Sequence, residues 1–73
     1  MIEYNVQEAI DHLNMIMLQE KEKGKREFGL KLNIADNSTD IIGYITNYYN
    51  SQLISCKMKY CELEKDYEII IWW

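Results

Sequence analysis

The sequence predicts an α+β fold with the element order α-β-α-β-β, and three observations lead to this prediction. Apolar residues recur at helical spacing over residues 6–23 and 39–50. Apolar and polar residues alternate over residues 27–34 and 53–61, as they do in a half-buried strand. In the final run, residues 67–73, the odd-numbered and the even-numbered positions both carry apolar residues, so both faces of a strand would be apolar. This is typical of a central strand that is covered on both sides.

The chain of 73 residues is expected to form one domain over residues 1–73. Its apolar share of 48% and charged share of 27% are those of a globular protein, and no linker, repeat or low-complexity segment interrupts it. A domain of this size buries only roughly 60% of the surface of its unfolded chain, so its stability is marginal. Such small domains often gain stability by self-association or by binding a partner.

Residues 6–23 are expected to form a helix that begins after Asn5 and ends before Gly24. Asn5 is a good N-cap, and Glu8, three residues later, completes a capping box. Gly24 is suited to the C′ position, where the backbone turns left-handed. One apolar stripe is predicted to face the core: Val6, Ala9, Ile10, Leu13, Ile16 and Met17.

Two apolar residues of this helix, Met15 and Leu18, fall outside the stripe, among the carboxylates of Glu8, Asp11 and Glu22. Single exposed apolar residues are common on protein surfaces. A pair at positions i and i+3 also suits a small contact patch for a partner. Both interpretations remain open at this point.

Residues 39–50 are expected to form a second helix, with Asn37 or Ser38 as its cap and Asp40 in its first turn. The competing interpretation is a strand, because Ile, Tyr and Thr favour strands and Gly43 is unfavourable in a helix. The apolar spacing of i, i+4 and i+7 favours the helix. Its predicted stripe is Ile41, Ile45 and Tyr48, with Ile42 and Tyr49 at one edge.

The last two strands are expected to form a hairpin with a four-residue loop and with Glu64 and Lys65 at its tip. The register that keeps one face apolar pairs Lys57 with Trp72 on the other face, where a cation–π contact is expected. The predicted pairs on the apolar face are Tyr60–Ile69, Met58–Ile71 and Cys56–Trp73.

These elements predict a small three-stranded sheet of the split β-α-β type, with both helices on one face. The strands at residues 27–34 and 53–61 would run parallel, and the last strand would lie between them, antiparallel to both. The alternative is an N-terminal helix on a four-stranded antiparallel sheet, in which residues 39–50 form a strand.

The net charge of −4 argues against direct nucleic-acid binding, which depends on Lys and Arg. It favours a protein partner with a basic surface, including one whose groove normally holds nucleic acid. The charged run at residues 20–27 alternates in sign, so a solvated helix end is expected there. No signal peptide and no membrane span are expected, and a cytoplasmic location follows, the host cytoplasm if the protein is phage-encoded.

No catalytic, cofactor or metal motif is visible in the sequence. Cys56 and Cys61 have opposite parity on one strand, so they are expected to be free thiols that point to opposite faces. His12 is the single histidine, and the expectation for it is an exposed helical residue without a nucleophile beside it. We therefore expect no enzyme, no cofactor and no metal.

Several residues remain as candidates for binding a partner. Near the hairpin tip the carboxylates of Glu62, Glu64 and Asp66 are expected to form an acidic turn. Tyr44 and Tyr49 are expected at the edges of the second helical stripe, where tyrosine suits an interface. The candidate partner-binding residues are thus Met15, Leu18, Tyr44, Tyr49, Glu62, Glu64, Asp66 and Trp72.

The expected function is a small acidic, non-enzymatic protein-binding module that inhibits a partner by blocking its surface. As a class, the chain resembles small phage or mobile-element proteins, including anti-CRISPR-type inhibitors, in its size, acidity and abundance of Ile, Asn, Lys and Tyr. The alternative is a self-associating structural or regulatory domain that forms a homodimer through a sheet face or an exposed strand edge.

Overall fold

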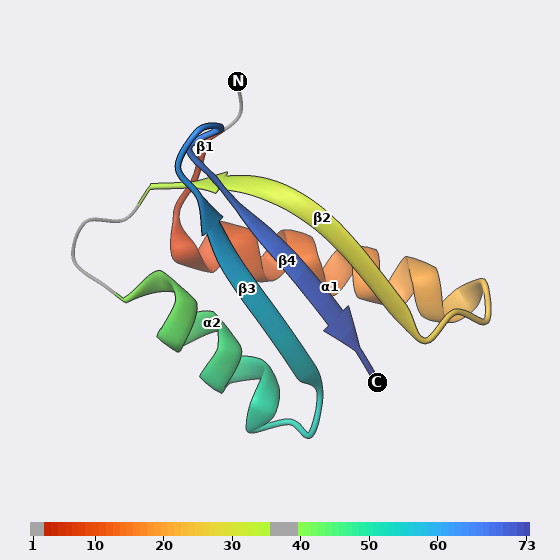
Figure 1. Cartoon of the computed structure of the whole chain (residues 1–73). Coiled ribbons are helices and arrows are strands. Elements are labelled where there is room, and N and C mark those ends of the chain that lie inside the picture. Colours follow the sequence, from red (N-terminus) through yellow and green to blue (C-terminus); the bar gives the residue numbers. More distant parts are fainter. Residues whose placement is uncertain (1–2, 36–39) are drawn as a thin grey trace.

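The protein folds into two helices and a four-stranded mixed sheet, which confirms the predicted α+β class (Figure 1). The computed structural model describes residues 3–35 and 40–73. In chain order the elements are β1 (Glu3–Tyr4), α1 (Val6–Glu22), β2 (Glu27–Ile34), α2 (Ile41–Asn50), β3 (Ser55–Cys61) and β4 (Asp66–Trp72).

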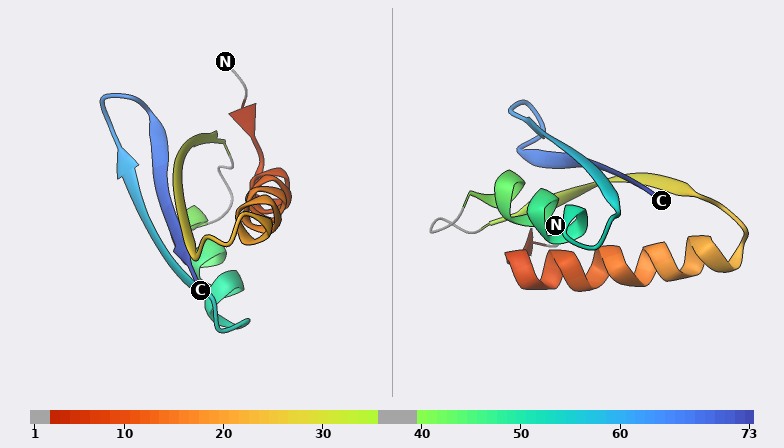
Figure 2. Two further views of the ribbon diagram at one scale, coloured as in Figure 1. Left: turned by 90° about the vertical axis from the view of Figure 1, so that its right-hand side faces the viewer. Right: turned by 90° about the horizontal axis from the view of Figure 1, so that it is seen from below.

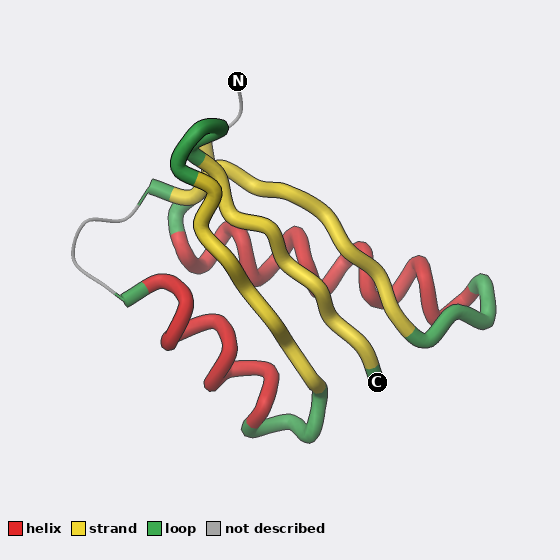
Figure 3. Tube along the Cα trace, in the orientation of Figure 1, coloured by secondary structure: helices red, strands yellow, loops and turns green. Residues whose placement is uncertain are grey.

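The sheet has the strand order β1-β2-β4-β3, so the last strand is central between β2 and β3, as predicted (Figure 3). It runs antiparallel to both of these neighbours. The sheet has a fourth strand, as in the alternative description, but this strand is β1 and it runs parallel to β2. Residues 41–50 are helical. A strand of two residues is too short to leave a periodic signal in the sequence.

Helix α1 begins and ends as the sequence predicts. The side chain of Asn5 accepts a hydrogen bond from the Glu8 amide at 2.8 Å, and the Glu8 carboxylate accepts one from the Asn5 amide at 3.1 Å. Gly24 follows the helix with a φ of +78°, the left-handed conformation that favours glycine.

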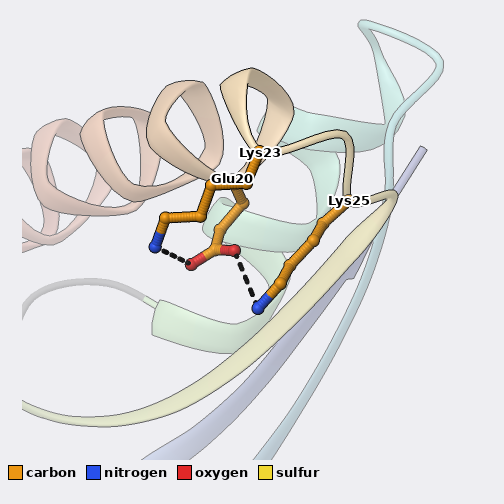
Figure 4. Close-up of polar contacts among 3 residues, drawn as sticks. All are labelled: Glu20, Lys23 and Lys25. Atoms are coloured by element: carbon orange, nitrogen blue, oxygen red, sulfur yellow. Dashed lines mark ion pairs between the residues drawn. The ribbon is translucent and has the colours of Figure 1, made fainter.

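The exit of α1 is held by one carboxylate, that of Glu20. Its two oxygens lie 3.7 Å from Lys23 Nζ and 3.4 Å from Lys25 Nζ (Figure 4). Because Lys25 lies beyond Gly24, the pair connects the helix to the segment that leads into β2. The Glu20 side chain is largely buried and both lysines are exposed. Because solvent screens exposed ion pairs, these contacts stabilise the fold little, and their main effect is to orient the segment between α1 and β2.

Helix α2 is capped by Asp40, which the sequence placed in the first turn. Its carboxylate accepts a hydrogen bond from the Gly43 amide at 3.1 Å. The alternative caps, Asn37 and Ser38, lie outside the described residues. Gly43 leaves room for this cap, because a Cβ there would lie 2.5 Å from Asp40 Oδ2.

The contact between Asp40 and Gly43 predicts a reversal of sign in a double-mutant cycle. Gly43→Ala should leave stability unchanged or lower it, because the gain in helix propensity, up to about 1 kcal/mol, is offset by loss of the cap. In an Asp40→Ala background the same change should stabilise by up to about 1 kcal/mol. Urea unfolding of the four proteins measures the coupling, and equal effects in both backgrounds would contradict it.

Both helices cover the same face of the sheet, and the core lies between these two layers (Figure 2). On β4 the buried residues are Ile69 and Ile71, which alternate with exposed Ile70 and Trp72. The hydrophobic residues of the core are Val6, Ala9, Ile10, Leu13, Leu32, Ile34, Ile41, Ile45, Tyr49, Ile69 and Ile71. The sequence predicted this alternation of faces on β4. It also placed Tyr60 of β3 on the buried face, and this is wrong because Tyr60 is 44% exposed.

The hairpin register differs from the prediction by two residues. Its loop has four residues, as expected, but these are residues 62–65. The observed pairs include Tyr60–Tyr67, Met58–Ile69, Cys56–Ile71, Lys59–Glu68 and Lys57–Ile70. The predicted contact of Lys57 with Trp72 is therefore wrong, and the cation–π contact is that of Lys21 over Trp73, at 5.5 Å. A shift by two keeps every side chain on its face, so the alternating pattern cannot detect it.

Candidate functional site

One face of the sheet is not covered by a helix, and its side chains form the first candidate surface. We call it the open sheet face and define it as Gly29, Lys31, Lys57, Lys59, Glu68, Ile70 and Trp72. At its centre Ile70 is 39% exposed and Trp72 is 40% exposed. This answers for Trp72 the question that the sequence leaves open, because the ring lies on the surface.

The strand register arranges this face in rows across the sheet. Gly29 and Lys57 flank Ile70, and Lys31 and Lys59 flank Glu68. Beside Gly29 lies an open hollow of about 820 Å³ that is also lined by Lys25, Ile70 and Trp72. In the last row Glu27 and Ser55 flank Trp72. The face thus has an apolar centre with charged residues of both signs around it.

The outward side of α1 forms the second candidate surface. Five residues repeat there at alternating steps of three and four, which places them in one line along the helix. We call this line the acidic seam: Glu8, Asp11, Met15, Leu18 and Glu22. Met15 is 51% exposed and Leu18 is 61% exposed, so the two residues form a contiguous apolar spot. Both residues are therefore exposed side by side, as a contact patch for a partner requires.

The seam carries three negative charges and no positive one. Glu8 and Asp11 lie on the N-terminal side of the apolar spot and Glu22 lies on its C-terminal side. Glu8 takes part in the helix cap, and Asp11 accepts a hydrogen bond from the Gln7 amide group at 3.0 Å. Within residues 3–35 and 40–73, none of the three forms an ion pair. Their charges therefore remain available to a partner.

The structure corrects the assignment of Tyr49 as a partner-binding residue. Tyr49 is completely buried, whereas Tyr48, assigned to the core, is only partly buried. The Tyr49 hydroxyl donates to Asn14 Oδ1 at 2.8 Å, and the Asn14 amide group donates to the Tyr48 hydroxyl at 3.2 Å. Asn14 of α1 thus binds both hydroxyls, and Tyr49 is buried on the α2 face that also carries Ile41 and Ile45. Tyr44 is exposed on α2, as expected, and belongs to neither candidate surface.

The acidic hairpin tip is smaller than the sequence suggests. Glu62 and Glu64 are exposed in the loop, but Asp66 is the first residue of β4 and is half-buried, so its assignment to the turn is wrong. Glu64 lies 2.6 Å from Lys31 Nζ, and this contact raises the pKa of Lys31. The ion pair neutralises one of the two remaining tip charges.

The structure describes the surroundings of His12 and of the two cysteines, the side chains that could carry chemistry. His12 is half-buried, in contrast to the expected exposure, because it stacks on Tyr4 with ring centroids 5.3 Å apart. Both cysteines are free, as predicted. Potential ligand atoms of Cys61, Glu64 and Asp66 lie within 4.8 Å of one another, but Lys31 already provides the cation at this cluster.

Cys56 is expected to react slowly with alkylating agents. Burial raises its pKa from 9.0 to about 11, so the thiolate fraction at pH 8 should be roughly a hundredfold lower than in the unfolded chain. The stability that depends on the neutral thiol should be lost as pH rises from 9 towards 11. In a Cys61→Ser variant, iodoacetamide labelling with and without urea isolates Cys56. Equal rates in the two conditions would contradict the prediction.

The chain matches no protein-family model, no curated protein and no solved structure. Neither described helix has the length and apolar character needed to cross a membrane. The functional argument therefore rests on the two surfaces. The seam can be identified from the sequence alone, because its five residues follow the spacing of a helix. The open sheet face required the register, because Gly29 and Lys57 are distant from Ile70 along the chain.

Proposed function

We propose that the protein is a non-enzymatic binding module that uses the acidic seam to bind and block a basic surface of a partner protein. The observation that carries this proposal is the seam itself, an apolar spot with unpaired carboxylates on both sides along one exposed helix face. A partner surface with an apolar groove edged by Lys or Arg complements it. Such surfaces are typical of proteins that hold nucleic acid, which fits an inhibitor of the phage or mobile-element type acting in the cytoplasm.

The shape of the seam supports docking into a groove. From Glu8 to Glu22 it extends over about 21 Å, at 1.5 Å per residue. An amphipathic helix that places its apolar line into a groove is a common mode of protein recognition. The apolar spot would supply the buried centre of such an interface, and the carboxylates would supply its charged rim.

The test compares two charge variants of the bait in a pull-down from the native host. The seam variant is Asp11→Lys with Glu22→Lys, and the matched control at the hairpin tip is Glu62→Lys with Glu64→Lys. Each variant changes the net charge from −4 to zero, because two acidic residues become basic. We expect wild type and the tip variant to capture the same protein, and the seam variant to bind it at least about tenfold more weakly.

The captured protein is then purified and its nucleic-acid binding is measured with and without this chain. We expect wild type to compete with nucleic acid, and added salt to weaken the complex because charged contacts are screened. If the tip variant loses the partner while the seam variant keeps it, the binding surface is the hairpin. If the captured protein has no basic surface, the proposed mode of inhibition is wrong.

A further inference from the structure

We propose that the acidic seam of one copy binds the open sheet face of the next copy, so that the protein assembles head to tail. The inference rests on the seam described above and names a second occupant for it. Assembly would hide the seam, and a basic partner would therefore compete with assembly. The two surfaces are complementary in direction, dimensions, apolar content and charge.

The two surfaces face away from each other. Helix α1 lies on one side of the sheet, and the open sheet face is the other side of this two-layer domain (Figure 2). The seam faces outward, because its residues are exposed and lie opposite the buried stripe of α1. Contact between unlike surfaces is heterologous, so each added copy presents a free surface of each kind. The assembly grows beyond a dimer unless its rotation closes a ring.

The dimensions of a helix fit this face. The seam is about 21 Å long, and strand β4, from Asp66 to Trp72, spans about 20 Å at 3.3 Å per residue. The three strands β2, β4 and β3 place their outer members about 10 Å apart, which is the diameter of a helix. One helix can thus cover the central strand and touch both of its neighbours.

Apolar and charged groups meet their complements in this arrangement. The spot formed by Met15 and Leu18 corresponds to the exposed pair Ile70 and Trp72. The seam places carboxylates beyond both ends of its apolar spot. The cations of the sheet that have no ion pair in the described residues are Lys57 and Lys59 on β3 and Arg26 near Trp72. Lys31 and Lys25 are already paired with Glu64 and Glu20, and Glu27 flanks Trp72.

Gly29 is a further indication of a docked partner. Glycine weakens the interior of a strand, and there it often marks close approach by another chain. The fold itself does not require it, because a Cβ at Gly29 would make only ordinary contacts of 3.5 and 3.6 Å, with Ile69 O and Ile70 Cγ1. Gly29 lines the hollow beside Trp72, and this hollow can accept an apolar side chain from the seam.

Charge argues most strongly against the symmetric pairing of two seams. Seam on seam would bring six carboxylates together without a cation among the seam residues. Open face on open face would bring the unpaired Lys57 and Lys59 of one copy towards those of the other, because Lys31 of each copy is already paired with Glu64. Glu27 and Glu68 of each copy would lie near this contact. Seam on open face is the pairing in which opposite charges meet, so it is favoured over the homodimer that the sequence suggested as the alternative.

The experiment uses three double variants that keep local propensities. Met15→Gln with Leu18→Gln removes the apolar spot of the seam, and Ile70→Thr with Trp72→Thr removes that of the sheet. Tyr44→Gln with Leu63→Gln removes two exposed apolar residues outside both surfaces. Circular dichroism checks folding, and sedimentation velocity measures mass from about 10 µM to about 1 mM, the range of weak interfaces.

Wild type and the control should grow beyond dimer with concentration, whereas the seam and sheet variants should each remain monomeric. A mixture of these two variants should form a dimer and nothing larger, because one seam and one sheet face remain intact between them. Wild type that stays monomeric or stops at a dimer would overturn the proposal. So would a mixture that contains only monomers.

Gly29→Thr provides a second test in which misfolding is not a concern. Threonine favours strands and its Cβ is tolerated, so the melting temperature should stay equal or rise. Assembly should weaken at least about tenfold because the added side chain occupies the part of the hollow next to Gly29. Unchanged assembly would remove Gly29 from the interface.

The outcomes separate this inference from the proposed function. If wild type captures a basic partner but never assembles, the head-to-tail model falls and the binding function stands. If wild type assembles, but the seam charge variant captures the same proteins as wild type, the proposed binding function falls and the assembly stands.

Discussion

Tyr49→Ala should lower the free energy of unfolding by about 3–5 kcal/mol, the largest loss that we expect from a single substitution. Tyr49 is fully buried where α2 meets α1, and its ring packs edge-on against Tyr48 at 5.0 Å. Truncating a buried aromatic residue costs about 3–5 kcal/mol. A domain of 73 residues has a total stability of roughly 4–11 kcal/mol, so this single change removes a large part of it.

Two tyrosine controls separate burial from hydrogen bonding. Tyr49→Phe keeps the ring but removes the donor to Asn14, and should cost about 1–2 kcal/mol. Tyr44→Ala, on the exposed side of the same helix, should change stability by less than about 1 kcal/mol. Urea unfolding followed by far-UV circular dichroism gives all three values. A Tyr49→Ala variant as stable as Tyr44→Ala would show that Tyr49 is not part of the core.

Ile71→Ala should destabilise the domain by about 3 kcal/mol, whereas Ile70→Ala, one residue away, should cost less than about 1 kcal/mol. Ile71 is completely buried under the helices, and Ile70 is on the open sheet face. The pair is a matched comparison because residue type, strand and substitution are the same. Only the face of the sheet differs.

Thermal and urea unfolding of both isoleucine variants measure the difference. Equal losses would mean that the open sheet face is buried in the protein as it exists in solution. A loss at Ile70 that appears only at high protein concentration would instead indicate burial by another copy, since association stabilises the folded state by mass action.

The two candidate surfaces give the small domain an asymmetric character. One outer side is helical and acidic with an apolar spot, and the other is a sheet with an apolar centre and lysines around it. The net charge of −4 hides this division, because it averages opposite charges on opposite sides. Composition alone therefore indicates an acidic protein, and only the arrangement shows that Lys57 and Lys59 lie on the side opposite the seam.

Much of the fold could be predicted because the signals were local. The capping box at Asn5, the glycine after α1 and the alternation over residues 27–34 each act within a few residues, and all three are confirmed. The seam belongs with them, since helical spacing alone aligns its residues. The predicted partner-binding residues Met15, Leu18, Tyr44 and Trp72 are exposed for the same reason, because each lies outside a predictable core stripe or face.

The sequence alone determined the periodicity of each element, the central position of the last strand and the line of carboxylates along α1. Tertiary structure decided which of Tyr48 and Tyr49 is buried, which register the hairpin takes, and which side chains surround Ile70. Adjacent helical residues and registers two apart satisfy the same pattern of apolar spacing. The choice between them depends on packing between residues that are far apart in the chain, such as Tyr49 of α2 and Ile10 of α1.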